Sequence, residues 1–439
     1  MKHLAAMILG TIAAAAAGLA IYVVAYSPGP MNVAGQTVAT QQQPDQGDAG
    51  LPVRFDKAVN LSNNALDSVY GQVVAEDNNV FVVWEESVPS TGSAQGQYTS
   101  RNYDIFVKRS VDNGTTFGSP VNLSNNTGFS EHPQAAVSNG SVYFAWTDNT
   151  SGNREISFIA GHDNGSSYTQ VRTLSNILNT TTTTNTTNSP ATDSSNVELA
   201  VSGNNVYVVW LEEAVDDSLH VVMRASHDGG ETFEKAVIVS DRANTATLPK
   251  IAADGSAVHV VWSLIGDEQE NGLFYSASTD KGLHFTIPKK LSDQNDFGEP
   301  QVAARNNTVY VISGGLDVVE VNGLFLAKSF DGGASFSSEI ADVNGSFVNP
   351  VNTELVLDGS APMIYVAGEV FQSNDEEILL LPLLIGQNST VPLGLLNLSD
   401  NAKVSECPSI AISGDRIFVV WEDLSPGNHE ILYARGMKI

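Results

Sequence analysis

Short runs of alternating apolar and polar residues recur along the chain with a period of about 50 residues, separated by Gly, Asn and Asp. The second repeat is the most complete, and its runs cover residues 134–138, 141–146, 155–162 and 168–175. Such alternation is typical of strands with one buried face, and Gly, Asn and Asp favour the turns between strands. Each repeat therefore predicts a four-stranded antiparallel sheet.

The second apolar run has nearly the same sequence in every repeat, so the number of its copies gives the number of repeats. The seven runs are NVFVVW, SVYFAW, NVYVVW, AVHVVW, TVYVIS, MIYVAG and RIFVVW, which end at Trp84, Trp146, Trp210, Trp262, Ser313, Gly368 and Trp421. Their number predicts seven sheets, with six or eight sheets as alternatives.

The last repeat stops after its third run, at Ile439. Residues 53–62 (VRFDKAVNLS) match the fourth-run segment of the first repeat at residues 115–124 (TTFGSPVNLS), so they can supply the missing strand. Sheets arranged in a ring hide their edges when the first strand of the chain pairs into the last sheet. The sequence predicts an all-β fold: a seven-bladed β-propeller of four-stranded antiparallel blades over residues 53–439, closed by the N-terminal strand.

A second motif, Ser/Gly-x-Asp-x-Gly-x-x-aromatic, follows the third run in five of the repeats. Its aspartates are Asp112, Asp163, Asp228, Asp280 and Asp331. A carboxylate beside a tight turn accepts backbone N–H bonds, the Gly tolerates positive φ, and the aromatic ring fills the gap between neighbouring sheets. These features predict a structural role, with calcium binding as the alternative.

This motif is the Asp-box, or BNR repeat, so residues 53–439 resemble the sialidase-like β-propeller superfamily. The resemblance implies the propeller fold and leaves function open, because Asp-boxes occur in sialidases, other glycosidases, sorting receptors and exported proteins. It also implies that the functional face lies opposite the Asp-boxes. That face is built from the loops that lead into first strands and the loops that join second to third strands.

The N-terminal segment predicts export. Lys2 and His3 precede an uncharged apolar run over residues 4–26, which is long enough to span a bilayer and has no clear cleavage site. We expect residues 1–26 to form a transmembrane anchor, with a cleaved signal peptide as the alternative, and residues 27–52 to form a flexible linker. The propeller then lies on the extracellular face of the cell membrane, or is secreted if the segment is cleaved.

Other features agree with an extracellular location. Asn-x-Ser/Thr sequons are frequent and predict a glycoprotein, although Asn60, Asn122 and Asn397 recur in a repeated Asn-Leu-Ser element that favours a role in turn geometry. A Thr-rich insertion at residues 179–195 is expected to be disordered. Cys407 is the single cysteine, which excludes an internal disulfide.

The formal net charge of −28 excludes nucleic acid as a partner, because phosphate backbones need a basic surface. An acidic surface favours cations, basic proteins or solubility. We expect a monomer that binds an extracellular glycan or protein and contacts the membrane through its N-terminal helix only.

Acidic residues gather in the two sets of loops that the resemblance assigns to the functional face. The predicted ligand- or cation-binding residues are Glu85, Glu131, His132, Asp148, Glu198, Glu212, Glu299, Glu406, Glu422 and His429. Glu131 and Glu406 occupy the same repeat position and are the candidate catalytic residues. The carboxylate pairs that follow the tryptophans also fit a role in blade geometry.

Sialidase activity is disfavoured by the arginines. The family clamps the substrate carboxylate with three arginines, whose planar forks match it bidentately. The usual Arg-Ile-Pro signature is absent, since Arg54 is followed by Phe55, and Arg109, Arg224 and Arg435 fall at outer positions of the repeat. The sequence therefore favours a binding or scaffold module, with a glycoside hydrolase of altered substrate as the alternative.

Two sets of residues are candidate metal ligands. Carboxylates and loop carbonyls favour calcium. A copper or zinc site built from His132, Cys407 and His429 is disfavoured, because these residues belong to blades two and seven, which the first blade separates. No other cofactor is indicated.

Overall fold

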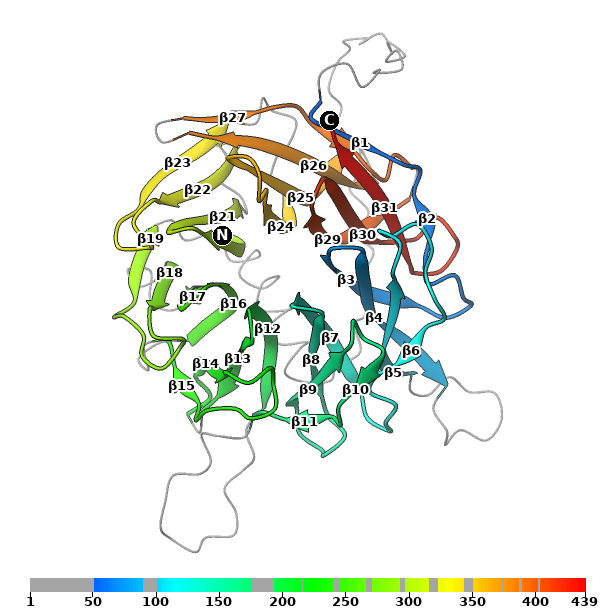
Figure 1. The fold of residues 1–439 in the computed structure, drawn as a ribbon, viewed down its shortest axis with the longest axis horizontal. Helices are drawn as coiled ribbons and strands as arrows, with labels where there is room; N and C mark the ends of the chain where they lie inside the picture. The colour runs from blue at the N-terminus through cyan, green and yellow to red at the C-terminus, as the bar shows by residue number, and fades with distance from the viewer. Residues whose placement is uncertain are drawn as a thin grey trace, which may run out of the picture. The chain divides into compact units, whose positions relative to one another are not determined.

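Seven sheets surround a central axis in the computed structural model (Figure 1). The inner strand of each sheet contacts the inner strand of the next, in the cyclic order β3, β7, β12, β16, β20, β24, β29 and back to β3. This closed cycle confirms the predicted seven-bladed propeller and excludes the six-bladed and eight-bladed alternatives.

The structure describes residues 51–89, 101–175, 193–214, 216–240, 245–265, 271–292, 297–315, 323–342, 350–372, 375–386, 389–401 and 403–439. All belong to one unit, Gly50–Ile439. The predicted anchor, the linker up to residue 50 and residues 179–192 of the predicted insertion lie outside this description. In the part of the chain that is described, no helix has the length and apolarity to cross a bilayer.

The blades follow one another in chain order, each from its inner to its outer strand. Blade 1 contains β3 (Ser68–Glu76), β4 (Asn79–Pro89), β5 (Arg101–Ser110) and β6 (Val121–Asn122). Blade 2 contains β7 (Ser130–Ser138), β8 (Ser141–Asp148), β9 (Glu155–His162), β10 (Ser167–Tyr168) and β11 (Arg172–Thr173). Blade 3 contains β12 (Ser194–Ser202), β13 (Asn205–Glu213), β14 (Leu219–Ser226) and β15 (Val237–Ile238).

Blades 4 and 5 keep the same order. Blade 4 contains β16 (Thr245–Asp254), β17 (Ala257–Ile265), β18 (Gly272–Ser278) and β19 (Lys289–Ser292). Blade 5 contains β20 (Phe297–Arg305), β21 (Thr308–Gly315), β22 (Gly323–Ser329) and β23 (Ser337–Asp342).

The last two blades are made of the remaining strands, some of which come from the start of the chain. Blade 6 contains β24 (Val351–Leu357), β25 (Met363–Gln372), β26 (Asp375–Ile385), β27 (Thr390–Pro392) and β28 (Leu396–Asn397). Blade 7 contains β29 (Ser405–Ser413), β30 (Arg416–Asp423), β31 (Glu430–Lys438), β1 (Val53–Phe55) and β2 (Val59–Asn60).

Blade 7 is closed by the N-terminal strand, as predicted. Strand β1 pairs antiparallel with β31 in the register Val53 to Lys438, and β2 pairs with the same strand further along. Arg435 donates two hydrogen bonds to the carboxylate of Asp56, at 3.0 and 2.7 Å. The outer edge of the last blade is thereby covered by the beginning of the described chain.

The second strand of each blade is buried on both faces. Val82 and Trp84 of β4 pack toward Phe418 of blade 7, whereas Phe81 and Val83 pack toward Phe144 of blade 2. These strands therefore have continuous apolar runs, as is typical of strands covered on both sides. The core consists of such layers between neighbouring blades.

Four Asp-boxes have the predicted hydrogen bonds. In blade 1, the Asp112 carboxylate accepts the Ser110 hydroxyl at 2.7 Å and the Thr116 N–H at 2.8 Å. Asp228, Asp280 and Asp331 accept the equivalent pair of bonds. The aromatic residue packs against the preceding blade; for example, Phe117 lies 5.0 Å from the Tyr433 ring.

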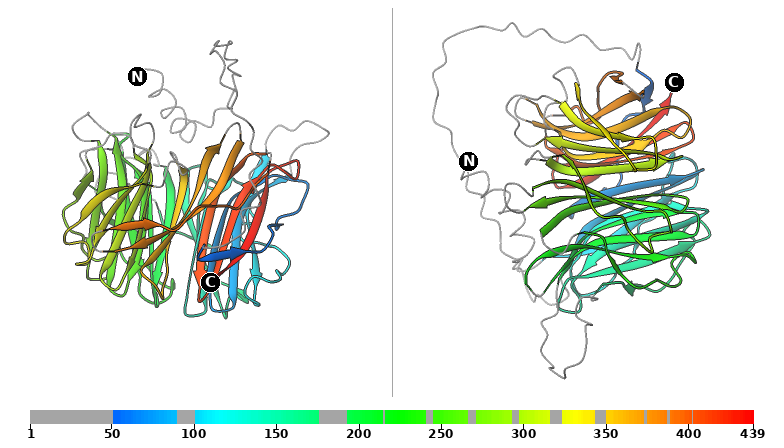
Figure 2. Two further views of the ribbon diagram at one scale, coloured as in Figure 1. Left: turned by 90° about the horizontal axis from the view of Figure 1, so that it is seen from above. Right: turned by 90° about the vertical axis from the view of Figure 1, so that its left-hand side faces the viewer.

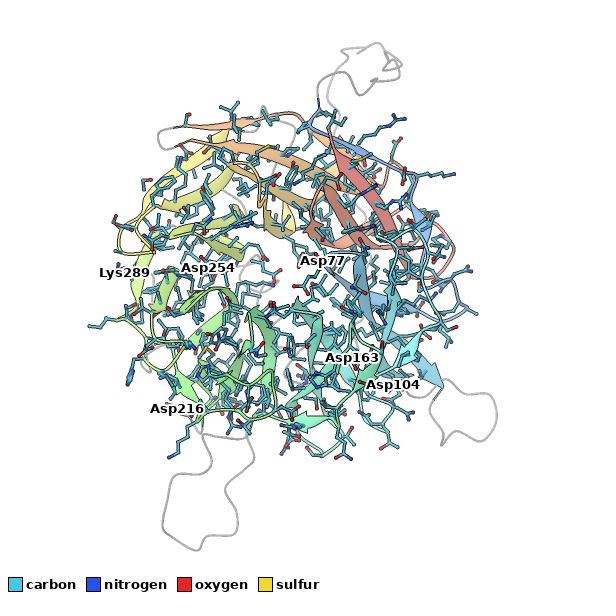
Figure 3. All side chains as sticks on the ribbon, in the orientation of Figure 1. Asp77, Asp104, Asp163, Asp216, Asp254 and Lys289 are labelled. Carbon is cyan, nitrogen blue, oxygen red and sulfur yellow. The ribbon has the colours of Figure 1, made fainter. Side chains whose placement is uncertain are left out.

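The fifth Asp-box, in blade 2, is built differently. Gly161 stands where the other four have serine, so the serine hydroxyl that bonds to the aspartate in those boxes is missing here. Asp163 also has a φ of 51°, in the left-handed region. Figure 3 labels this residue in blade 2. The five turns are therefore less alike in structure than their shared sequence motif suggests.

Hydrogen bonds test two further expectations, one on the repeated Asn-Leu-Ser element and one on the Thr-rich insertion. The Oδ1 atoms of Asn60, Asn122 and Asn397 accept the N–H of the third residue further on, at 2.8, 2.8 and 2.9 Å, which confirms their role in turns. Strand β12 begins at Ser194, inside the range predicted for the Thr-rich insertion, and the buried Ser194 hydroxyl bonds to Glu212 at 2.8 Å.

Candidate functional site

Every inner strand is interrupted by a β-bulge near its start. The register of β3 against β4 shifts between Val69 and Gln72, and the other six inner strands shift at the equivalent place. Two residues of each blade lie between the paired positions, and one of them from each blade belongs to a set that we call the bulge ring: Tyr70, His132, Asn196, Leu248, Glu299, Asn352 and Cys407. Bulges commonly aim side chains at functional sites.

Six members of the bulge ring have a left-handed backbone although none is glycine. Their φ angles run from 46° to 54°. Such conformations cost about 1–3 kcal/mol each and tend to cluster at functional sites. The bulges lie where inner strands begin and second strands end, which we call the channel face. The Asp-boxes follow the third strands and lie on the opposite face, as the family resemblance implied; Figure 2 shows the strands running between the two.

In two places, a carboxylate that follows the apolar run of the second strand accepts a hydrogen bond from the bulge-ring residue of the next blade. Glu85 of blade 1 accepts the N–H of His132 in blade 2 at 3.1 Å. In the same way, Glu369 of blade 6 accepts the N–H of Cys407 in blade 7 at 3.4 Å. Burial raises the pKa of Glu85, and Glu131 raises it further. The predicted site residue Glu85 is thus a buried group that joins two blades.

An acidic cluster lies in blades 6 and 7. We call it the Glu406 cluster; it comprises Glu369, Glu376, Glu406, Glu422 and His429. The ligand atoms of Glu406, Glu422 and His429 all lie within 4.8 Å of one another, and the same limit holds for Glu369, Glu376 and Glu406. Burial, followed by a hydrogen bond that the protonated Glu376 donates to Glu406, raises the pKa of Glu376 to about 7.

The Glu406 cluster unites three predicted residues with others. Glu406 directly precedes the bulge of β29, Glu422 comes from β30, and His429 precedes β31 and contacts the Glu422 carboxylate through its Nδ1 atom. Glu369 escaped the prediction because its second strand ends in glycine instead of tryptophan. Its position in the repeat could have identified it, because Glu369 directly follows Gly368 just as Glu85 directly follows Trp84.

Blades 1 and 2 contribute an aromatic pair beside the Glu406 cluster. The rings of Tyr70 and His132 lie 4.5 Å apart, and Tyr70 is 41% exposed. Burial of the hydroxyl and the charges of Cys407 and Glu85 raise the pKa of Tyr70, while burial lowers the pKa of His132. Glu131 forms a 3.7 Å ion pair with Arg154. Glu131 belongs to blade 2 and Glu406 to blade 7, and blade 1 stands between these two blades.

In blades 3 to 5, a lysine forms ion pairs with two of the carboxylates on the channel face. The Nζ atom of Lys250 lies 2.6 Å from Glu198 and 2.7 Å from Glu299. We call these three residues the Lys250 triad. Burial raises the pKa of Glu198 to about 7, against the opposing effect of Lys250. Two residues expected on an open acidic face are therefore bound to a lysine that the sequence analysis did not single out.

Two other residues predicted on the functional face accept hydrogen bonds inside their own blades. Asp148 accepts the indole N–H of Trp146 at 3.1 Å, and Glu212 accepts that of Trp210 at 2.7 Å. Burial alone would raise the pKa of Asp148, but hydrogen bonds from Thr150, Trp146 and Ser130 lower it. Both carboxylates are at most 8% exposed, so they are internal hydrogen-bond acceptors.

The role of these acceptors is clearest where one is replaced. Blade 4 has Leu264 at the position of Glu212. Among the described residues, the Trp262 indole N–H there has no hydrogen-bond partner. An acid two residues after the tryptophan is therefore explained by blade geometry, the interpretation that the sequence had left open.

Comparison with known proteins supports the fold and leaves the function open. No family model matches the chain, and no curated protein matches its sequence. A protein of unknown function from Dyadobacter fermentans is 12% identical, with 88% of this chain and 100% of that chain covered and a TM-score of 0.51. A polysaccharide lyase, an ulvan lyase of a new family, is 10% identical, with 86% and 95% covered and a TM-score of 0.55.

Sialidases are also among the similar structures. Trypanosoma rangeli sialidase in complex with the inhibitor DANA is 12% identical, with a TM-score of 0.49. The match covers 88% of this chain and 60% of the sialidase, so the chain spans less than two thirds of that protein. The protein is thus an all-β seven-bladed propeller whose fold is similar to that of the Dyadobacter fermentans protein and of the ulvan lyase.

Proposed function

We propose that the protein is a binding module, tethered at the extracellular face of the cell membrane, that holds a glycan or protein partner on its channel face. The observation that carries this proposal is the composition of blades 6, 7, 1 and 2. Carboxylates gather there around Tyr70 and His132, and the described arginine among them, Arg154, is paired with Glu131. An anionic ligand would be repelled.

A neutral glycan fits this surface best. Carboxylates are pure acceptors, and the hydroxyl groups of a sugar are donors. The exposed Tyr70 ring offers an apolar face against which a sugar ring can pack. Pockets that bind small ligands combine such an apolar surface with a few placed polar groups. The described residues that meet these needs are Tyr70, Glu131 and Glu406.

The test is a glycan array of neutral, anionic and amino sugars, probed with the purified full-length chain, together with a release assay on the same glycans. We expect binding to neutral glycans without turnover, and Tyr70→Ala to weaken it about tenfold, the effect of about 1.4 kcal/mol. Ile287→Ala is the control, because Ile287 is 88% exposed in the β18–β19 connection on the opposite face. Equal loss in both variants, or selective binding of sialic acid, would contradict the proposal.

A glycoside hydrolase is the second candidate, and the pairing of Glu376 with Glu406 favours it. Their ligand atoms lie within 4.8 Å. Inverting enzymes need a gap of about 6.5–9.5 Å to admit water between the two carboxyl groups, so a hydrolase that used this pair would retain configuration. Turnover of any glycoside that is lost in both Glu406→Gln and Glu376→Gln, with retained stereochemistry, would replace the binding proposal by this one.

A further inference from the structure

Glu406, Glu422 and His429 bring two carboxylates and one imidazole to a single point of blade 7. Their ligand atoms lie within 4.8 Å of one another. Two atoms bound to one ion at about 2.0–2.2 Å can be at most about 4.4 Å apart, so small side-chain movements suffice to place all three around an ion. The backbone beneath them is well fixed, because β29, β30 and β31 are paired along their lengths.

Glu422 is used differently from its counterparts in other blades. Glu85 and Glu369 occupy the same position and accept the N–H of the next blade's bulge residue. Glu422 instead contacts the His429 Nδ1 atom. The carboxylate is thus turned toward a potential metal ligand in the blade where a histidine faces it.

Charge balance gives a second and independent reason for a bound cation. Glu369 and Glu422 are only 4% and 6% exposed, and buried carboxylates need compensation. Glu369 accepts hydrogen bonds from Asn352 and from the Cys407 N–H, and Glu422 pairs with His429. Among the described ion pairs, the four carboxylates of the cluster therefore have only this histidine as a cation. The Lys250 triad supplies that compensation in blades 3 to 5. The other described lysine and arginine ion pairs of the propeller also go to carboxylates outside the Glu406 cluster, as in Arg154 with Glu131 and Lys438 with Asp358.

We propose that Glu406, Glu422 and His429 bind a divalent transition-metal ion, with zinc as the best-fitting probe. The imidazole decides the class of ion, since calcium and magnesium prefer oxygen ligands only, whereas zinc and manganese accept nitrogen and oxygen together. Three protein ligands leave a tetrahedral ion one open position, which a water molecule can fill. This inference needs no partner and does not rest on the proposed function.

The experiment is calorimetric titration of chelator-treated, full-length protein with Zn²⁺, Mn²⁺ and Ca²⁺. We expect one zinc site, with manganese weaker as the Irving–Williams order requires and calcium weakest. His429→Ala should weaken zinc binding by at least about tenfold, the lower range for loss of a metal-site group. His284→Ala is the matched control, because His284 is an exposed histidine that pairs with Asp280 in an Asp-box on the opposite face.

Two further measurements keep the test decisive if His429→Ala unfolds. Glu406→Gln removes one ligand charge with little change of shape and should also weaken zinc binding. The absorption spectrum of the cobalt-substituted wild type should show coordinated nitrogen and oxygen, with no change in His284→Ala. Absence of zinc binding, zinc binding that both ligand variants retain, or calcium binding tighter than zinc would overturn the inference. None of these outcomes depends on whether the glycan array detects a partner.

Discussion

The Lys250 triad and the Glu406 cluster stand on equivalent parts of the same repeat, yet they balance charge in different ways. Both use bulged inner strands to bring carboxylates together on the channel face. In blades 3 to 5 a lysine lies between two of them at 2.6 and 2.7 Å. In blades 6 and 7 a histidine and four carboxylates converge instead.

The two regions show that one repeat can place carboxylates in two different electrostatic environments. A buried lysine that is held by two carboxylates is satisfied internally and has little left to offer a ligand. A group of carboxylates that lacks an internal lysine retains its affinity for cations and hydroxyl groups. The repeat geometry alone would make the channel face uniform, and the residues at a few equivalent positions make it asymmetric.

The largest expected effect comes from breaking the Lys250 triad. Lys250→Met leaves Glu198 and Glu299 unpaired in a largely buried place, which should cost about 3–5 kcal/mol of the free energy of unfolding. Urea unfolding measures it. Lys235→Met, at an exposed position, is the control and should change stability by less than about 0.5 kcal/mol. A loss no greater than that of the control would show that the triad is not needed for compensation.

A lysine placed in the Glu406 cluster should abolish the difference between the two regions. Glu376→Lys supplies an internal cation and should weaken zinc binding between about tenfold and a hundredfold, as measured by titration calorimetry. The same charge change at the exposed Glu234, on the opposite face, should leave zinc affinity unchanged. If both variants lose affinity equally, net charge and not the local site is responsible.

The pH dependence of stability should distinguish Glu198 from an ordinary surface acid. Its folded-state pKa of about 7 lies above the usual 4.5, so the folded protein binds the extra proton between these values. The resulting stabilisation is fully present below about pH 4.5 and is lost as the pH rises through about 7. Unfolding free energies measured between these pH values should fall more steeply in the wild type than in Glu198→Gln; equal slopes would contradict this assignment.

The smallest effect is expected on the opposite face, where the Asp-boxes differ among themselves. Hydrogen bonds from the Ser335 side chain and N–H, and from Ser329, lower the pKa of Asp331 to about 2. Asp331→Asn should therefore lower the melting temperature at neutral pH, and its difference from the wild type should vanish as the pH falls from about 3.8 to 2. Asp163→Asn should lower the melting temperature less, because Gly161 lacks the serine hydroxyl of the other boxes, and an equal loss there would mean that both boxes stabilise alike.

The fold could be predicted from the sequence because its signals are local. Alternation, turn residues and the matching segment at residues 53–62 identified the blades and their closure. The same holds for Asn60 and its equivalents, whose hydrogen bonds span three residues. Local patterns also identified most of the carboxylates on the channel face.

The candidate site could be predicted only in part, because its contacts join blades. Whether a carboxylate is free depends on partners far away in the chain; Lys250 and Glu198, for example, are 52 residues apart. The bulges add a second difficulty, since they shift the register by an amount that no alternating pattern reveals. Sequence reasoning could therefore find Glu406 and His429, but it could not separate them from Asp148 or Glu212.

The closure of blade 7 has a consequence for biosynthesis. Asp56 and Arg435, which join the two ends of the propeller, are 379 residues apart. Strands β1 and β2 are made first and stay without their partner until β31 has been synthesised, and an unpaired strand edge invites association with other chains. Because β31 follows His429 directly, the cluster on the channel face is among the last parts to assemble, and a nascent propeller acquires it only when its ring closes.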